Sequence, residues 1–127
     1  MRRMTVGSSA DDQRRSQLLR GALDLCLLQL IAERPRYGFE FTEALTGAGL
    51  ELVSEGSIYP LLARMERAGL VSSYRARSAS GGPPRKYYRL TEAGSAELTN
   101  GRAVWHAFTG QVGRLLADTT SMGDTTS

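Results

Sequence analysis

Two short segments of the 127-residue chain combine basic and aromatic side chains at spacings that suit binding to a polyanion. The first, GSIYPLLARMERAGLV at residues 56–71, carries Tyr59 and Arg64 on the polar faces of an expected helix. The second, RKYYRL, begins with Arg85 and Lys86. Arginine and lysine pair with phosphate oxygens, and arginine also forms bidentate hydrogen bonds with guanine edges. These residue types indicate noncovalent recognition of a nucleic acid.

The remaining reactive side chains do not form a catalytic or metal-binding set. His106 is the only histidine, and Cys26 is the only cysteine. The sequence has no glycine-rich phosphate loop and no nucleophile beside a base. Two ligands are too few for a high-affinity metal site, and one cysteine excludes an intramolecular disulfide. We therefore expect no enzyme activity, no metal and no cofactor, and we expect Cys26 to be a small buried apolar residue.

The positive charge of the chain is concentrated in one block. The net charge is +3, but residues 64–89 contain seven basic side chains and one acidic side chain, Glu66, a local net charge of +6. Residues 37–63 contain four acidic and no basic side chains. A solvated surface would mix the two signs, whereas a block of one sign attracts polyanions, because each neutralised phosphate releases counterions.

Apolar periodicity predicts three helices before this basic block. The first is expected from Ser16, as N-cap, to Arg34, which precedes a proline. The second contains Phe41 and Leu45 and ends at a pair of glycines. In the third, apolar residues recur at spacings of three and four along residues 58–65. Helices with one apolar face pack together around a core.

Pro60 allows two starts for the third helix. If Ser57 is the N-cap, Pro60 lies at the third helical position, where a backbone N–H has no partner within the helix. If Ser54 is the N-cap, Pro60 removes a hydrogen bond to the Gly56 carbonyl and should bend the first turn. Both starts place Tyr59 and Pro60 near the N-terminal end of the helix.

A hairpin and a long helix complete the expected fold. The turn sequence SASGGPP separates two short strands within residues 71–90, and Thr91 is expected to cap the last helix. Strand alternation places Tyr88 and Leu90 toward the core and leaves Lys86, near the turn, free to reach a ligand. The last helix has a long apolar stripe but several glycines, so we expect it to be stable only when paired.

Three helices followed by a basic hairpin are the plan of a winged helix-turn-helix domain, so the expected fold class is mainly α with a small β-hairpin. We predict a flexible arm at 1–15, the DNA-binding domain at 16–90, a C-terminal dimerisation helix at 91–119 and a disordered tail at 120–127. Neither a signal peptide nor a membrane span is visible, so a cytoplasmic location without membrane contact is expected.

The sequence resembles the PadR-type winged-helix transcriptional regulators over roughly residues 16–100. The resemblance rests on the segments LLRGALDLCLLQLI, YGFEF, SEGSIYPLLARMERAGLV and GGPPRKYYRLTEAG. It implies a homodimer, held by the last helix, that binds double-stranded DNA at an inverted repeat. Many members are repressors released by small aromatic or drug-like molecules. The alternative is a helical dimer that binds a ligand or partner without binding specific DNA.

The resemblance assigns two groups of site residues. The expected DNA contacts are Ser54, Ser57, Tyr59, Pro60 and Arg64 on the third helix and Arg77, Arg85 and Lys86 on the wing. Tyr59 is expected either to reach a phosphate or to be a partly buried packing residue. Four residues of the last helix either line an effector cavity between subunits or fill the dimer interface: Leu98, Trp105, Phe108 and Val112.

Overall fold

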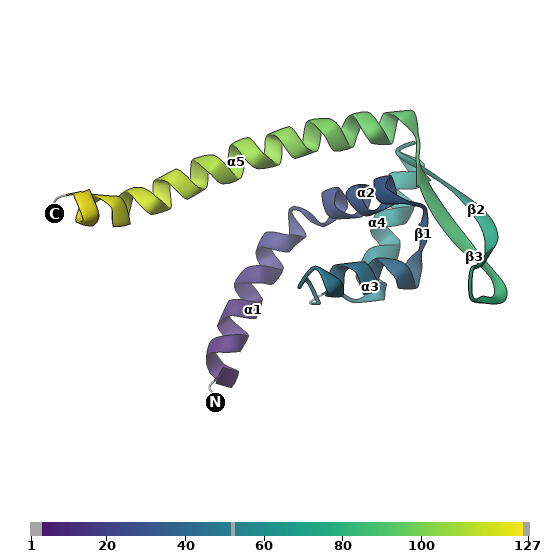
Figure 1. Ribbon diagram of the computed structural model, residues 1–127, viewed down its shortest axis with the longest axis horizontal. Coiled ribbons are helices and arrows are strands. Elements are labelled where there is room, and N and C mark those ends of the chain that lie inside the picture. Colours follow the sequence, from purple (N-terminus) through teal and green to yellow (C-terminus); the bar gives the residue numbers. More distant parts are fainter. Residues whose placement is uncertain (1–3, 52, 126–127) are drawn as a thin grey trace.

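A computed structural model describes residues 4–51 and 53–125 (Figure 1). The described part of the chain contains five helices and three strands. In chain order they are α1 (Met4–Arg20), α2 (Leu23–Glu33), β1 (Arg36–Tyr37), α3 (Gly38–Gly47), α4 (Glu55–Arg67), β2 (Val71–Ser78), β3 (Gly81–Leu90) and α5 (Glu92–Thr125).

The helices α2, α3 and α4 pack against one face of a small sheet, while α1 and α5 extend away from this body (Figure 1). α5 runs past α2 and then continues alone, and α1 diverges from it on the other side of α2 (Figure 1). Within the described residues no helix combines the length and the apolar content needed to cross a bilayer.

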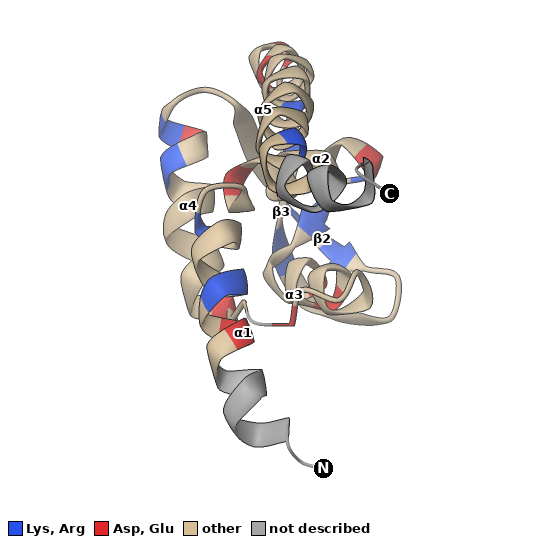
Figure 2. Cartoon of the chain, turned by 90° about the vertical axis from the view of Figure 1, so that its left-hand side faces the viewer, with Lys and Arg blue, Asp and Glu red and all other residues tan. Residues whose placement is uncertain are grey.

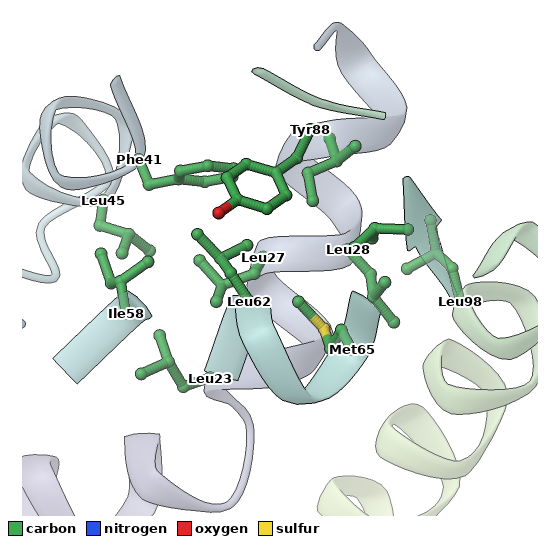
Figure 3. Packing of buried hydrophobic residues seen from close by; sticks show 12 residues of the cluster. Leu23, Leu27, Leu28, Phe41, Leu45, Ile58, Leu62, Met65, Tyr88 and Leu98 are labelled. Atoms are coloured by element: carbon green, nitrogen blue, oxygen red, sulfur yellow. The ribbon is translucent and has the colours of Figure 1, made fainter. Parts of the chain in front are cut away.

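The core is formed by apolar side chains from the three central helices and the sheet (Figure 3). Leu27, Phe41, Ile58 and Leu62 are completely buried. Each contributes about 1.5–3 kcal/mol relative to an exposed side chain. The expected periodicities of the second and third helices are thereby confirmed, because their apolar residues are the ones that face this core.

The sheet has the antiparallel order β1-β3-β2. Tyr88 pairs with Ser73 and is 6% exposed, and its ring meets Phe41 edge to face at 6.3 Å between centroids. The expected alternation along β3 is confirmed at this residue. The two-residue strand β1 was not predicted, because Arg36–Tyr37 is too short to produce a periodic signal.

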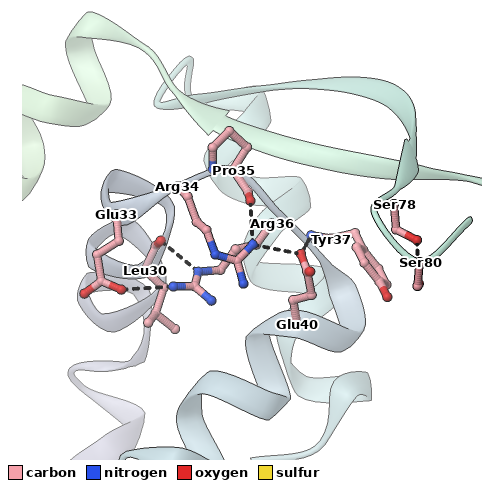
Figure 4. A network of polar contacts seen from close by, with 9 residues as sticks. All are labelled: Leu30, Glu33, Arg34, Pro35, Arg36, Tyr37, Glu40, Ser78 and Ser80. Carbon is pink, nitrogen blue, oxygen red and sulfur yellow. Dashed lines mark hydrogen bonds and ion pairs between the residues drawn. The ribbon is translucent and has the colours of Figure 1, made fainter.

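Arg36 holds the junction between α2 and α3 (Figure 4). It is 8% exposed, and its Nε donates at 2.9 Å to the Leu30 carbonyl in the last turn of α2, which also accepts from the Arg34 backbone N–H at 3.4 Å. Its Nη2 donates to Glu33 Oε1 at 3.0 Å. At the start of α3, the Tyr37 backbone N–H donates to Glu40 Oε1 at 3.2 Å. These contacts orient α3, the first helix of the helix-turn-helix.

The structure differs from the sequence prediction at both ends of the chain. A single helix from Ser16 to Arg34 is wrong, because Gly21 and Ala22 form a turn that separates α1 from α2. Glycine is a poor helix former, and the turn directs the apolar face of α2 into the core. Residues 4–15, expected as part of a flexible arm, and 120–125, expected as part of a disordered tail, are helical. Residues 1–3 and 126–127 lie outside the described part.

Candidate nucleic-acid interface

The helix α4 begins at Glu55 with Ser54 as its N-cap residue, so the earlier of the two expected starts is correct. Pro60 is therefore the sixth helical residue and cannot donate a hydrogen bond to the Gly56 carbonyl. The hydroxyls of Ser54 and Ser57 lie 3.2 Å apart and are exposed. The two hydroxyls hydrogen-bond to each other, and Ser54 makes no side-chain hydrogen bond that caps the helix. The pair still has one hydrogen to donate to a ligand.

Tyr59 projects from the first turns of α4 and is 47% exposed. Its hydroxyl donates to Glu55 Oε2 at 2.8 Å, one helical turn earlier. This hydrogen bond is the main reason why the pKa of Tyr59 is raised above its ordinary value. The ring lies directly over Gly38 at the start of α3, where any side chain would overlap the phenol. The hydroxyl end of the Tyr59 ring is therefore placed by Glu55 on one side and by the start of α3 on the other.

An open cleft of about 360 Å³ lies between the start of α4, the start of α3 and the wing, the hairpin of β2 and β3. Its walls include Phe39, Glu55, Tyr59, Arg85 and Lys86. The structure thus brings together three of the DNA contacts expected from the sequence, Tyr59, Arg85 and Lys86. Figure 2 shows lysine and arginine on α4 and on the hairpin.

The other expected contacts lie around this cleft rather than in it. Arg64 is exposed on α4, and Arg67 follows it on the last turn. Arg77 is exposed near the wing turn, where its Nη1 donates to the Gly82 carbonyl at 2.7 Å. The basic groups therefore spread from α4 to the tip of the wing, as the charge count along the sequence predicted.

Lys86 has an acidic partner that the sequence did not predict. Its Nζ lies 3.6 Å from Glu66 Oε1, and the Ser73 hydroxyl donates to Glu66 Oε2 at 2.6 Å. Glu66 thereby connects the end of α4 to both strands of the wing. About half of the Lys86 side chain remains exposed, so Lys86 contacts α4 through Glu66 and is also accessible from solvent.

Three tyrosines cover the sheet face opposite the core. The rings of Tyr74 and Tyr87 stack at 5.7 Å, and Tyr37 meets Tyr87 edge to face at 5.4 Å. The guanidinium groups of Arg89 and Arg85 lie over Tyr74 and Tyr37 at 4.5 and 5.1 Å. Aromatic and cation–π contacts of this kind stiffen the sheet from which the wing projects. The sequence pattern could indicate the tyrosine of β3 in this cluster. It could not indicate Tyr37, which reaches the cluster through the unpredicted strand β1.

A second concave surface follows α5. An apolar groove of about 740 Å³ lies between α5 and the helices α1 and α2. Trp105, Phe108 and Val112 line it, together with Leu18 of α1 and Leu25 of α2. Leu98, expected on the same stripe, is instead 7% exposed and belongs to the core.

The apolar residues of α5 remain largely open to solvent. The largest exposed fractions are those of Val104 (59%), Phe108 (58%), Leu115 (70%), Leu116 (67%) and, on α1, Leu18 (62%). Monomeric proteins rarely expose a continuous apolar patch of this kind. In the described part of the chain, no cluster of three or more histidine, cysteine, aspartate or glutamate side chains could hold a metal ion.

The helix-turn-helix of α3 and α4, followed by the basic hairpin, defines a winged-helix protein. Residues 27–100 match the sequence profile described as the Transcriptional regulator PadR-like family. The chain belongs to this family, whose members are transcriptional regulators rather than enzymes.

Individual proteins agree with this assignment. The transcriptional regulator Rv3488 of Mycobacterium tuberculosis is 37% identical over 83 residues, which are 65% of this chain and 75% of that protein. The crystal structure of a PadR-like transcriptional regulator from Bacillus cereus is 39% identical, with a TM-score of 0.73 over 79% of this chain and 96% of that one. A PadR family regulator from Eggerthella lenta is 35% identical, with a TM-score of 0.70 over 86% and 96% of the two chains.

Proposed function

We propose that the protein is a homodimeric repressor that binds an inverted repeat in double-stranded DNA and is released by a small aromatic effector. The basic surface carries the DNA-binding part of this proposal. Residues 64–89, with a net charge of +6, comprise the last turn of α4 and most of the wing. When such a surface binds DNA, counterions are released from the phosphates that it neutralises, and this release favours binding.

In this proposal α4 enters the major groove, as the second helix of a helix-turn-helix does. Its leading end presents Ser54, Ser57, Tyr59 and Pro60, and Arg64 follows about one turn further on. Arg77, Arg85 and Lys86 of the wing contact the flanking backbone. Two recognition helices of a dimer reach half-sites about 34 Å apart, which gives an inverted repeat.

The exposed apolar stripe of α5 supports the homodimer. The side chains of Val104, Phe108, Leu115 and Leu116 are largely exposed, and α5 extends beyond the body of the protomer (Figure 1). A second copy of the same helix would cover this stripe. The groove beside Trp105 is apolar and large enough for a planar aromatic molecule, which supports the effector part of the proposal.

Salt-dependent binding to non-specific duplex DNA tests this function. The logarithm of the affinity should fall steeply with the logarithm of salt concentration for the wild type, and the Arg77→Ala/Arg85→Ala variant should flatten the slope by about two units. The control is Arg102→Ala, an exposed arginine of α5 outside the proposed surface, which should leave the slope unchanged. A wild-type protein that does not bind would favour the helical module without DNA binding.

A further inference from the structure

The hydrogen bond between Tyr59 and Glu55 determines which polar groups this end of α4 can recognise. A phenol has one hydrogen to donate, and Tyr59 donates it to Glu55 Oε2 at 2.8 Å. An ionised carboxylate has no hydrogen and can only accept. The two side chains together therefore present hydrogen-bond acceptors, and no donor, to a ligand that approaches from the solvent.

This arrangement is a poor fit for a phosphate. Phosphate oxygens are acceptors and carry negative charge, so they would be repelled by the Glu55 carboxylate and by the phenol oxygen. Arg85 of the wing, which lines the same cleft, and the exposed Arg64 further along α4 are the groups that suit the backbone. Tyr59 and Glu55 need a donor from the DNA instead.

The major groove supplies such donors on only two bases. Cytosine presents its N4 amino group and adenine its N6 amino group, whereas guanine and thymine present O6 and O4, which are acceptors. We propose that Tyr59 and Glu55 form an acceptor-only contact that selects cytosine or adenine at one position of each half-site, with Gly38 and Glu55 positioning the phenol. This inference rests on the proposed DNA-binding function and assigns Tyr59 to a base edge rather than to a phosphate.

Gly38 makes the contact selective because it fixes where the phenol lies. A Cβ at position 38 would overlap the hydroxyl and the ring of Tyr59, so only glycine allows the ring to lie against the start of α3. The ring remains 47% exposed while it is held there. A group positioned in advance loses little conformational entropy on binding, which increases discrimination between bases.

The test measures base preference rather than affinity alone. A random duplex library is selected with the wild-type protein, and the recovered sequence is then synthesised with each base pair replaced in turn. Tyr59→Phe should lose roughly tenfold or more of the discrimination at one position per half-site while affinity for non-specific duplex is kept. Gly38→Ala, which displaces the ring, should lose discrimination at the same position.

Two glutamate variants test the direction of the hydrogen bond. In Glu55→Ala the phenol regains a free hydrogen, so guanine or thymine should become acceptable where cytosine or adenine was selected. In Glu55→Gln the amide oxygen can still accept from Tyr59, but the amide NH2 adds a donor beside the phenol. The preference should therefore weaken even though the phenol oxygen remains an acceptor. The control is Glu51→Ala, which removes one exposed negative charge outside the contact and should leave base preference unchanged.

The possible results separate the two proposals. If Tyr59→Phe lowers affinity for all duplexes alike, or changes nothing, the acceptor-only contact is overturned while DNA binding stands. Because every base pair holds one amino base and one keto base, the contact is identified by replacing the selected cytosine or adenine with an analogue that lacks the exocyclic amino group. Unchanged wild-type affinity for this duplex would overturn the contact as well. If the wild type shows no salt-dependent binding to any duplex, the proposed function itself fails.

Discussion

Glu66 lowers the positive charge that the wing can offer to DNA. Its carboxylate lies 3.6 Å from Lys86 Nζ, so a phosphate that approaches Lys86 must compete with it. Glu66→Gln should raise affinity for all duplexes alike, by up to about fivefold, because an exposed pair of this kind is worth at most about 1 kcal/mol. The glutamine can still accept from Ser73. Titration with labelled non-specific duplex at low salt measures the effect.

Glu92→Gln is the matched control, since Glu92 is exposed in the first turn of α5. An equal gain in both variants would show that only the net charge of the protein changed. Weaker binding by Glu66→Gln would show instead that Glu66 is needed to hold the wing against α4.

Cys26, which was expected to be a buried apolar residue, is only partly buried. It is half-buried and packs against the core, and burial, with a smaller effect of Asp24, raises the pKa of its thiol above the usual 9.0. The thiolate is the reactive form, so alkylation by iodoacetamide near neutral pH should be slower in the folded protein than in urea. Equal rates in the two conditions would contradict the burial of this thiol.

The same pKa shift has a defined effect on stability. The folded state holds the thiol proton more tightly than the unfolded state does. Its contribution to the free energy of unfolding is therefore present below the ordinary thiol pKa, and it is lost as the pH rises through the raised folded-state pKa. Comparing urea unfolding of the wild type with Cys26→Ala at pH 7 and above pH 9, about the ordinary thiol pKa, isolates this contribution.

At the scale of elements, Arg36 connects α2 to the helix-turn-helix. It is buried and donates to the Leu30 carbonyl and to Glu33. Arg36→Met keeps an unbranched apolar stem but removes these donors, so the free energy of unfolding should fall by about 1.5–3 kcal/mol. Urea unfolding followed by circular dichroism gives this value.

Arg34 offers a control two residues away. Its side chain is 55% exposed and lies 3.6 Å from Glu40, so Arg34→Met should cost less than about 1 kcal/mol. Similar losses for Arg34→Met and Arg36→Met would show that the buried hydrogen bonds of Arg36 contribute little beyond an exposed charge.

The elements show which parts of the fold a sequence can reveal. Residues 58–65 have a clear helical period, and the burial of Ile58, Leu62 and Met65 confirms it. Residues 4–15 have no apolar period, so nothing in their pattern distinguished a helix from an irregular arm. The close approach of α3 and α4 was also hidden, because Gly38 and Tyr59 are separated by a loop and meet only after both helices pack.

Spacing along α5 did not predict which of its apolar residues belong to the core. Leu98 and Trp105 are seven residues apart and share a face, which suggested one common role. Leu98 lies where α5 still crosses the core, whereas Trp105 lies about two turns further on and lines the open groove. Gly101, between them, has a packing role that propensity does not reveal, since a Cβ there would overlap the side chain of Leu25.

At the scale of the whole molecule, the proposed homodimer and the proposed effector site involve the same helix. The exposed residues of α5 predict that the protein sediments as a dimer at micromolar concentration. A mass of 13.8 kDa, that of one chain, would contradict the dimer. Leu115→Ala should weaken association without touching the groove, because Leu115 is 70% exposed and does not line it.

Trp105 allows the two proposals to be separated. It is the only tryptophan, so the emission comes from this one residue on the groove wall, and a planar aromatic compound that binds in the groove should quench or shift it. The same compound should release DNA, because coupling between two binding sites is reciprocal. If Trp105 is a wall of the effector site, Trp105→Leu should abolish release in a DNA-binding assay while the protein still sediments as a dimer. If Trp105 only fills the interface, Trp105→Leu should weaken the dimer by at most a few kcal/mol and keep the release. A panel of aromatic compounds that leaves the emission of the wild type unchanged would remove the effector from the proposal.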